Sequence, residues 1–187
     1  KRKKRTLTKQ ELVSLRDYQC KNTKDEFARD MFLLSFYLVG MNTRDLYDCP
    51  APVFGRIEYN RGKTKDRRED QAFISIKVEP EAQAIIDKYK GKKALLDLKD
   101  FVSFKQFNNI LNKHLKNIAL GLFFYMARHT WASMARNKCD VSKDDVAMAL
   151  NHIDQVLKTT DTYIDPDWTI IDRANRKVLD YLSSCQQ

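Results

Sequence analysis

The chain has 187 residues, of which 43% are hydrophobic, and this is enough to bury the core of one domain. Its formal net charge of +9 favours a polyanion as partner, with nucleic acid first, although a merely basic protein is the alternative. The sequence contains no apolar run of membrane-spanning length and no signal peptide, and its four cysteines are scattered. We therefore expect a cytoplasmic protein without membrane contact, disulfide framework or structural zinc site.

The chain opens with five consecutive basic residues, Lys1 to Arg5. Such a charge run does not pack, and we interpret residues 1–7 as a basic linker or arm. Because the first residue is Lys1, we also expect a fragment of a longer protein. Residues 8–187 are expected to form the remaining domain.

Apolar side chains at helical spacing predict most of this domain as helix. A capping box of Thr8 and Glu11 opens the first helix, and a wide apolar face between Thr23 and Gly40 predicts a core helix. A tight turn after Gly40 leads into a short helix. Further helices are predicted at 80–89, 103–120, 122–136, after Ser142, and at 169–182.

Two segments, 56–60 and 71–76, alternate apolar and polar side chains and predict a β-hairpin. The turn between them is strongly basic and carries five cations: Arg61, Lys63, Lys65, Arg67 and Arg68. Such a tip can enter a groove of DNA or place one lysine beside a scissile phosphate, whereas a solvated charged turn is the alternative. The predicted fold class is therefore mainly α with a small antiparallel β-sheet.

No glycine-rich phosphate loop, zinc-protease motif or serine-hydrolase motif is present. Adjacent carboxylates such as Asp144 and Asp145 are typical of a helix start, which disfavours a two-metal nuclease. The segment from Tyr125 to Ala132 instead places an arginine, Arg128, in an apolar-faced helix, and Trp131 within it is predicted to lie in the core. Read together with His152 and Tyr163, this segment has the residue types that suit chemistry on a phosphodiester.

Four segments, taken in order, resemble the catalytic domain of the tyrosine recombinases, the phage integrase family. Residues 61–64, Arg-Gly-Lys-Thr, are similar to the β-hairpin lysine segment, and residues 127–132 are similar to the second-arginine box. Residues 149–152, Ala-Leu-Asn-His, resemble the Leu-Gly-His box, and residues 159–163 resemble the nucleophile segment. The likeness extends from about residue 8 to 182, and residues 172–177 resemble integrases from mobile elements of Bacteroides-like bacteria.

This resemblance implies a tyrosine recombinase catalytic-domain fold and a site-specific DNA recombinase or integrase. Tyr163 would form a 3′-phosphotyrosine, Arg128 would grip the non-bridging oxygens, and Lys63 would protonate the leaving 5′ oxygen. His152 would donate a hydrogen bond to the phosphate or assist the nucleophile. Arg61, Lys65, Arg67 and Arg68 would contact the DNA.

The resemblance also implies double-stranded DNA as the partner, four protomers assembled on two DNA sites, and no metal, cofactor or small-molecule substrate. It further implies that an N-terminal core-binding domain is missing before Lys1. The terminal helix, 169–182, would dock on a neighbouring protomer. Its apolar face could equally pack within its own chain.

Two positions depart from the family pattern. The place of the first arginine is occupied by Asn42, and we expect Arg44 to replace that arginine, with Arg61 as the competitor. Tyr125 stands where the family has a histidine, and a phenol can still donate a hydrogen bond to a phosphate. These departures leave open an alternative function, a catalytically impaired DNA-binding protein on the same fold.

Overall fold

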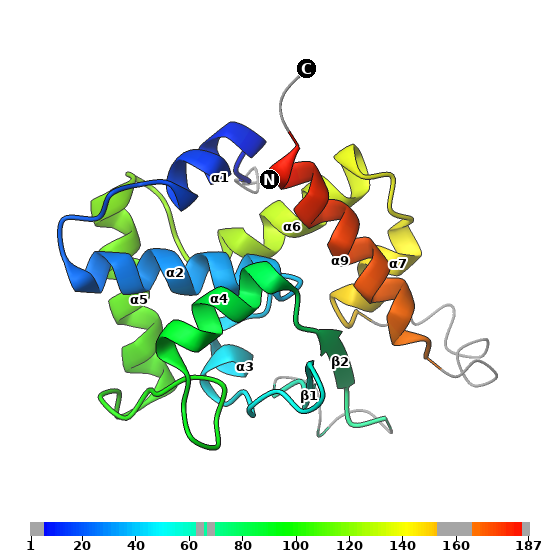
Figure 1. Cartoon of the computed structure of the whole chain (residues 1–187), viewed down its shortest axis with the longest axis horizontal. Coiled ribbons are helices and arrows are strands. Elements are labelled where there is room, and N and C mark those ends of the chain that lie inside the picture. Colours follow the sequence, from blue (N-terminus) through cyan, green and yellow to red (C-terminus); the bar gives the residue numbers. More distant parts are fainter. Residues whose placement is uncertain (1–5, 63–65, 67–69, 153–165, 185–187) are drawn as a thin grey trace.

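The computed structural model describes residues 6–62, 66, 70–152 and 166–184 (Figure 1). Within these ranges the chain forms eight helices and one antiparallel sheet of two strands, which confirms the predicted mainly α class. Among the described helices, none combines the length and the apolar character needed to cross a membrane.

Helix α2 (Thr23–Tyr37) is the centre of the core and runs across the middle of the molecule (Figure 1). From Asp30 to Tyr37 every side chain is buried, because other elements cover the helix on all sides. The covering helices are α1 (Lys9–Arg16), α4 (Pro80–Tyr89), α5 (Phe104–Ile118) and α6 (Met126–Lys138). Each large apolar side chain buried here contributes about 1.5–3 kcal/mol to folding.

The hairpin consists of strands β1 (Arg56–Asn60) and β2 (Phe73–Lys77), with Ile57 opposite Ile76 in the register. The first strand has the predicted bounds, whereas the second begins two residues later than predicted. The reason is backbone conformation, because Gln71 and Ala72 have φ values of 50° and 53° and cannot continue an extended strand.

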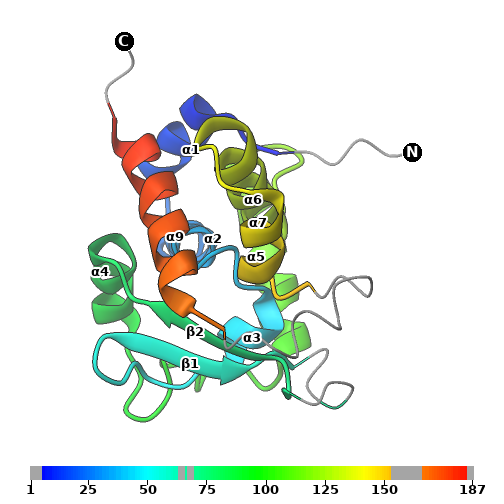
Figure 2. The same ribbon diagram turned by 90° about the vertical axis from the view of Figure 1, so that its right-hand side faces the viewer.

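Helix α9 (Trp168–Ser183) packs on α6, on α7 (Lys143–Ala149) and on β2 of its own chain (Figure 2). Its apolar face is buried, including Ile171, Val178 and Leu179. The structure therefore shows this helix packed within its own chain, which is the second of the two arrangements expected for it.

Trp131 on α6 is fully buried, as predicted, and joins α6 to α9 and α2. Its indole N–H donates to Oδ1 of Asn175 at 2.9 Å, and the Asn175 amide donates to the Tyr37 carbonyl at 2.9 Å. This buried relay fixes the C-terminal helix to the centre of the core.

Helix α6 begins at Met126, four residues later than predicted, because residues 124 and 125 form a turn in which Met126 N–H donates to the Phe123 carbonyl at 3.0 Å. Tyr125 is therefore the residue that precedes the helix. Leu7, at the end of the expected basic arm, donates its backbone N–H to Oγ1 of Thr130 at 3.0 Å. The first five residues of that arm lie outside the described ranges.

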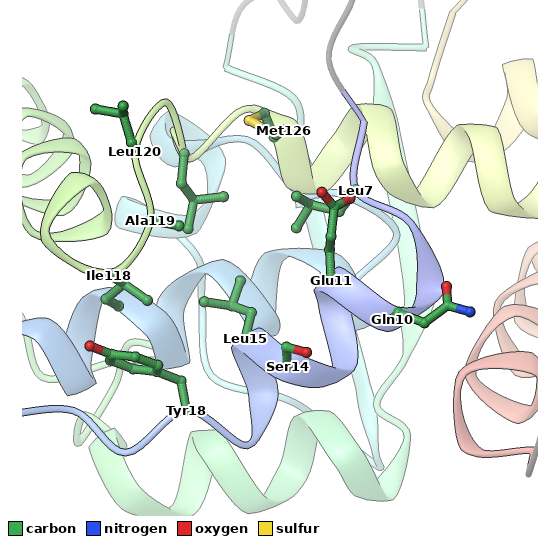
Figure 3. A pocket seen from close by; sticks show the side chains of 11 residues that line it. Leu7, Gln10, Glu11, Ser14, Leu15, Tyr18, Ile118, Ala119, Leu120 and Met126 are labelled. Carbon is green, nitrogen blue, oxygen red and sulfur yellow. The ribbon is translucent and has the colours of Figure 1, made fainter.

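A hollow of about 340 Å³ lies between α1 and the segment that joins α5 to α6 (Figure 3). Its lining is mainly apolar and includes Leu15, Leu120 and Met126. Among the described residues, none of those predicted to carry chemistry lines this hollow.

Candidate functional site

Two buried arginines meet where the end of β1, helix α6 and the end of α7 come together. Arg61 directly follows β1 and is 8% exposed, and Arg128 lies in the first turn of α6 and is 6% exposed. Nη1 of Arg61 donates to the Leu150 carbonyl at 3.4 Å, and Nη2 of Arg128 donates to the same oxygen. One backbone carbonyl thus holds both guanidinium groups.

Each arginine also donates to one further backbone carbonyl. Nη1 of Arg61 also donates to the Asn151 carbonyl at 3.2 Å, and Nη1 of Arg128 donates to the Gly40 carbonyl at 3.1 Å. Neutral carbonyl oxygens accept the N–H bonds without cancelling the charges. The two side chains are therefore fixed in position, and these carbonyls leave their positive charges in place.

Burial and the neighbouring charge of Arg61 both lower the pKa of Arg128, while Tyr125 and Tyr59 act in the opposite direction. Among the described residues, one carboxylate reaches ion-pair distance of the pair: Oδ2 of Asp45 lies 4.0 Å from Nε of Arg61. That Nε is buried and has no hydrogen-bond partner within the described part of the chain. Two cations facing one carboxylate make a site that favours an added anion.

Gly40 allows α6 to approach the loop that follows α2. Its φ is +68°, and a Cβ at this position would lie 2.6 Å from Cα of Arg128. A side chain here would therefore strain the backbone and push against the helix that carries the arginine. Glycine is needed both for the turn and for the contact between its carbonyl and Arg128.

Asp45, in helix α3 (Thr43–Tyr47), ties this helix to the hairpin. Its Oδ1 accepts the backbone N–H of Gly62 at 2.9 Å, and its Oδ2 accepts from Nδ2 of Asn42 at 2.6 Å. Asn42 is the N-cap of α3, because its Oδ1 accepts the Asp45 backbone N–H at 2.9 Å. The place of the family's first arginine is thus a helix cap in this chain.

Arg44 does not join the buried pair. Its Nε lies 2.7 Å from Oδ2 of Asp48, its guanidinium lies 4.7 Å from the centre of the Phe104 ring, and its side chain is 53% exposed. Arg61, which was expected to contact DNA from the basic turn or to compete with Arg44 for the place of the first arginine, is buried beside Arg128. The geometry favours Arg61 over Arg44 as the partner of Arg128.

The end of α7 has the hydrogen bonds of a Schellman motif. Asn151 N–H donates to the Met148 carbonyl at 2.8 Å, and His152 N–H donates to the Ala147 carbonyl at 2.8 Å. Asn151 has a φ of 51°, the left-handed conformation that this motif requires. The motif presents two carbonyls, those of Leu150 and Asn151, to the arginines and puts the exposed His152 immediately after them.

Tyr125 is half-exposed and lies three residues before Arg128, a spacing that puts neighbouring side chains on one helix face. Its ring packs edge-on against His129, with ring centres 4.8 Å apart. The structure therefore gathers Arg61, Arg128, Tyr125 and the backbone of His152 in one region. The other predicted site residues, Lys63, Lys65, Arg67, Arg68 and Tyr163, lie outside the described residues.

Three residues of this site were not predicted from the sequence as part of it: Gly40, Asp45 and Asn151. The spacing Asn-x-x-Asp from Asn42 to Asp45 is a capping signal that could have indicated the role of Asp45. Asn151 stands where a glycine is usual at a helix end, and asparagine is the common substitute there. The contact between Gly40 and α6 has no local signal, because it depends on tertiary packing.

The described residues include no group of three or more histidine, cysteine, aspartate or glutamate side chains arranged to hold a metal ion. Cys20, Cys49 and Cys139 are free thiols.

Comparisons of the chain with protein-family models, with curated proteins and with solved structures found no match.

Proposed function

We propose that the chain is the catalytic domain of a site-specific DNA recombinase, an integrase of a mobile element, that acts through a 3′-phosphotyrosine. The observation that carries this proposal is the buried pair of Arg61 and Arg128, held by the Leu150 carbonyl next to His152. Two buried cations that have one carboxylate within ion-pair distance among the described residues are costly unless an anion compensates them. A phosphodiester offers two non-bridging oxygens, and the forked donors of arginine suit them.

In the proposed reaction, the phenol oxygen of Tyr163 attacks the scissile phosphorus while its proton passes to solvent, directly or through His152. The bond from phosphorus to the 5′ oxygen breaks, and Lys63 gives that oxygen a proton. Attack by the 5′-hydroxyl of another strand reverses the step and releases Tyr163. The phosphotyrosine keeps the bond energy, so strand exchange needs no ATP.

The arginine pair would stabilise the extra negative charge of the pentavalent transition state. A free phenol has a pKa near 10, so the nucleophile is weak at neutral pH unless the phosphate is made electrophilic. We assign the role of the missing first arginine to Arg61 rather than Arg44. Tyr125 and His152 would donate hydrogen bonds to the same phosphate.

The proposed partner is double-stranded DNA, which fits the net charge of +9, with Lys65, Arg67 and Arg68 of the hairpin turn contacting it. We further propose that four protomers act on two DNA sites in the cytoplasm. Because α9 is packed on its own chain, contacts between protomers would have to use other surfaces.

To test this proposal, the protein is incubated with a DNA substrate that is nicked near the crossover site, so that religation fails and a covalent adduct accumulates. A pool of mobile-element ends supplies candidate sites. We expect an adduct that resists denaturation, a fall in its rate of formation of about 10²–10³-fold in Arg61→Ala, and little change in Arg44→Ala. Equal losses in the two variants would contradict the assignment of Arg61.

A second candidate, a DNA-binding protein on the same fold without catalysis, is favoured by Asn42 and Tyr125, which replace an arginine and a histidine of the family pattern. Both candidates predict salt-dependent DNA binding, so binding alone does not separate them. DNA binding without any adduct, on the protein's own attachment site, would favour this second candidate.

A further inference from the structure

Asn151 bonds to the base of the hairpin through its side chain. Its Nδ2 donates to the Ala72 carbonyl at 2.9 Å and is 3.4 Å from the Phe73 carbonyl, both on the returning side of the hairpin. The residue is 9% exposed, so these bonds are shielded from water. A helix end needs only the left-handed backbone at this position, which glycine would also provide. The side-chain amide of Asn151 is therefore not needed to end the helix.

The backbone of Asn151 bonds to the outgoing side of the same hairpin. Its carbonyl accepts from Nη1 of Arg61 at 3.2 Å, and the Arg61 backbone N–H donates to the Ala72 carbonyl at 3.0 Å. Arg61, Ala72 and Asn151 therefore form a closed ring of hydrogen bonds. The ring joins both sides of the hairpin base to the end of α7.

We propose that Asn151 is a positioning residue that locks the hairpin base and the Arg61 guanidinium to the end of α7. This inference rests on the proposed function, because it concerns the same phosphate site. The hairpin turn carries Lys63, and the chain beyond α7 carries Tyr163, the expected acid and nucleophile. The ring fixes the roots of both segments against one another and against the arginine that grips the phosphate.

The chemistry of asparagine suits this task. It tolerates a positive φ, as glycine does, and it supplies the N–H donor that glycine lacks. An aspartate would fit the backbone equally well, yet its oxygens would face the Ala72 carbonyl without a proton to donate. The two substitutions therefore remove the amide hydrogen bond to Ala72 while keeping the backbone conformation that ends the helix.

The test compares Asn151→Gly and Asn151→Asp with Asn60→Ala as the matched control. Asn60 also donates its amide to a hairpin carbonyl, that of Gln71 at 3.0 Å, but this bond is exposed and stays within the hairpin. Two quantities are measured on the full chain: hydrogen exchange of the Arg61 and Gly62 backbone amides, and single-turnover cleavage of the nicked substrate at saturating DNA.

We expect faster exchange at Arg61 in both Asn151 variants and a fall of about 10- to 100-fold in the single-turnover rate, with the Kd for DNA nearly unchanged. Asn60→Ala is expected to change neither the exchange at Arg61 nor the rate. Unchanged exchange in the Asn151 variants, or faster exchange with an unchanged rate, would overturn the inference. Absence of adduct in the unmodified protein would instead refute the proposed function, and the exchange data would still decide whether the ring of hydrogen bonds fixes Arg61.

Discussion

Replacing Gly40 with alanine tests the packing that puts Arg128 in place. The substitution adds one methyl group at a residue with a φ of +68°, and this group would lie 2.6 Å from Cα of Arg128 and 3.0 Å from its Cβ. Both nearest atoms belong to the root of the side chain and cannot rotate away. The loop and α6 must therefore separate.

Gly40→Ala lowers the free energy of unfolding in two ways. A left-handed conformation costs a residue with a Cβ about 1–2 kcal/mol relative to glycine, and overpacking in a close-packed interior costs about 1–3 kcal/mol. We therefore expect the free energy of unfolding to fall by about 2–5 kcal/mol. Because the Gly40 carbonyl accepts from Arg128, the separation also loosens the arginine pair.

Gly55→Ala is the matched control, because Gly55 has a φ of +74° and nothing within 4 Å of the added methyl group. Urea unfolding of both variants gives the two free energies, and their difference isolates the steric contact. We expect Gly40→Ala to be less stable than Gly55→Ala by about 1–3 kcal/mol. Equal losses in the two variants would refute the close approach of α6 to Gly40.

Three further substitutions probe stability by urea unfolding. Trp131→Phe leaves Oδ1 of the buried Asn175 without its hydrogen-bond donor. We expect this unsatisfied oxygen alone to lower the free energy of unfolding by about 1–3 kcal/mol. An unchanged free energy of unfolding would contradict the hydrogen bond. Burial would raise the pKa of Asp25, but hydrogen bonds from His114 and other donors lower this pKa below its ordinary value of 3.8. The ionised Asp25 carboxylate therefore stabilises the fold above that pH, and this stabilisation is lost as the pH falls below it. Asp25→Asn should be less stable than wild type at pH 7, and the difference should narrow as the pH falls below 3.8. Burial raises the pKa of Asp45 above its ordinary value of 3.8. As the pH rises from 3.8 through the raised pKa, the free energy of unfolding of wild type should therefore fall relative to that of Asp45→Asn. The opposite trend would contradict this prediction.

Much of the fold could be predicted because local signals and tertiary structure agree. Proline is tolerated in the first turn of a helix, and an apolar face follows Pro80, so α4 has the predicted bounds. The capping box of Thr8 with Glu11 is also confirmed. The start of β2 was misplaced because alternation suggested an extended backbone where Gln71 and Ala72 turn left-handed.

The candidate site was harder to predict, because its key contacts join residues distant in sequence. From the sequence, Arg61 was expected to contact DNA from the basic turn or to take the place of the first arginine, and neither expectation included its burial. The structure buries it beneath the end of α7, where carbonyls of Leu150 and Asn151 accept its N–H groups. Periodicity carries no information on such a contact, since residues 61 and 150 meet only after the hairpin packs on α7.

The central claim is that Tyr163 becomes covalently linked to DNA. The adduct formed on the nicked substrate is digested with protease and nuclease, and the remaining nucleotide-bearing peptide is sequenced by mass spectrometry, with Tyr163→Phe as the control. The proposed function predicts a nucleotide 3′-phosphate on Tyr163 and no adduct in the Phe variant. A nucleotide on another residue such as Tyr125, or an adduct that persists in Tyr163→Phe, would contradict it.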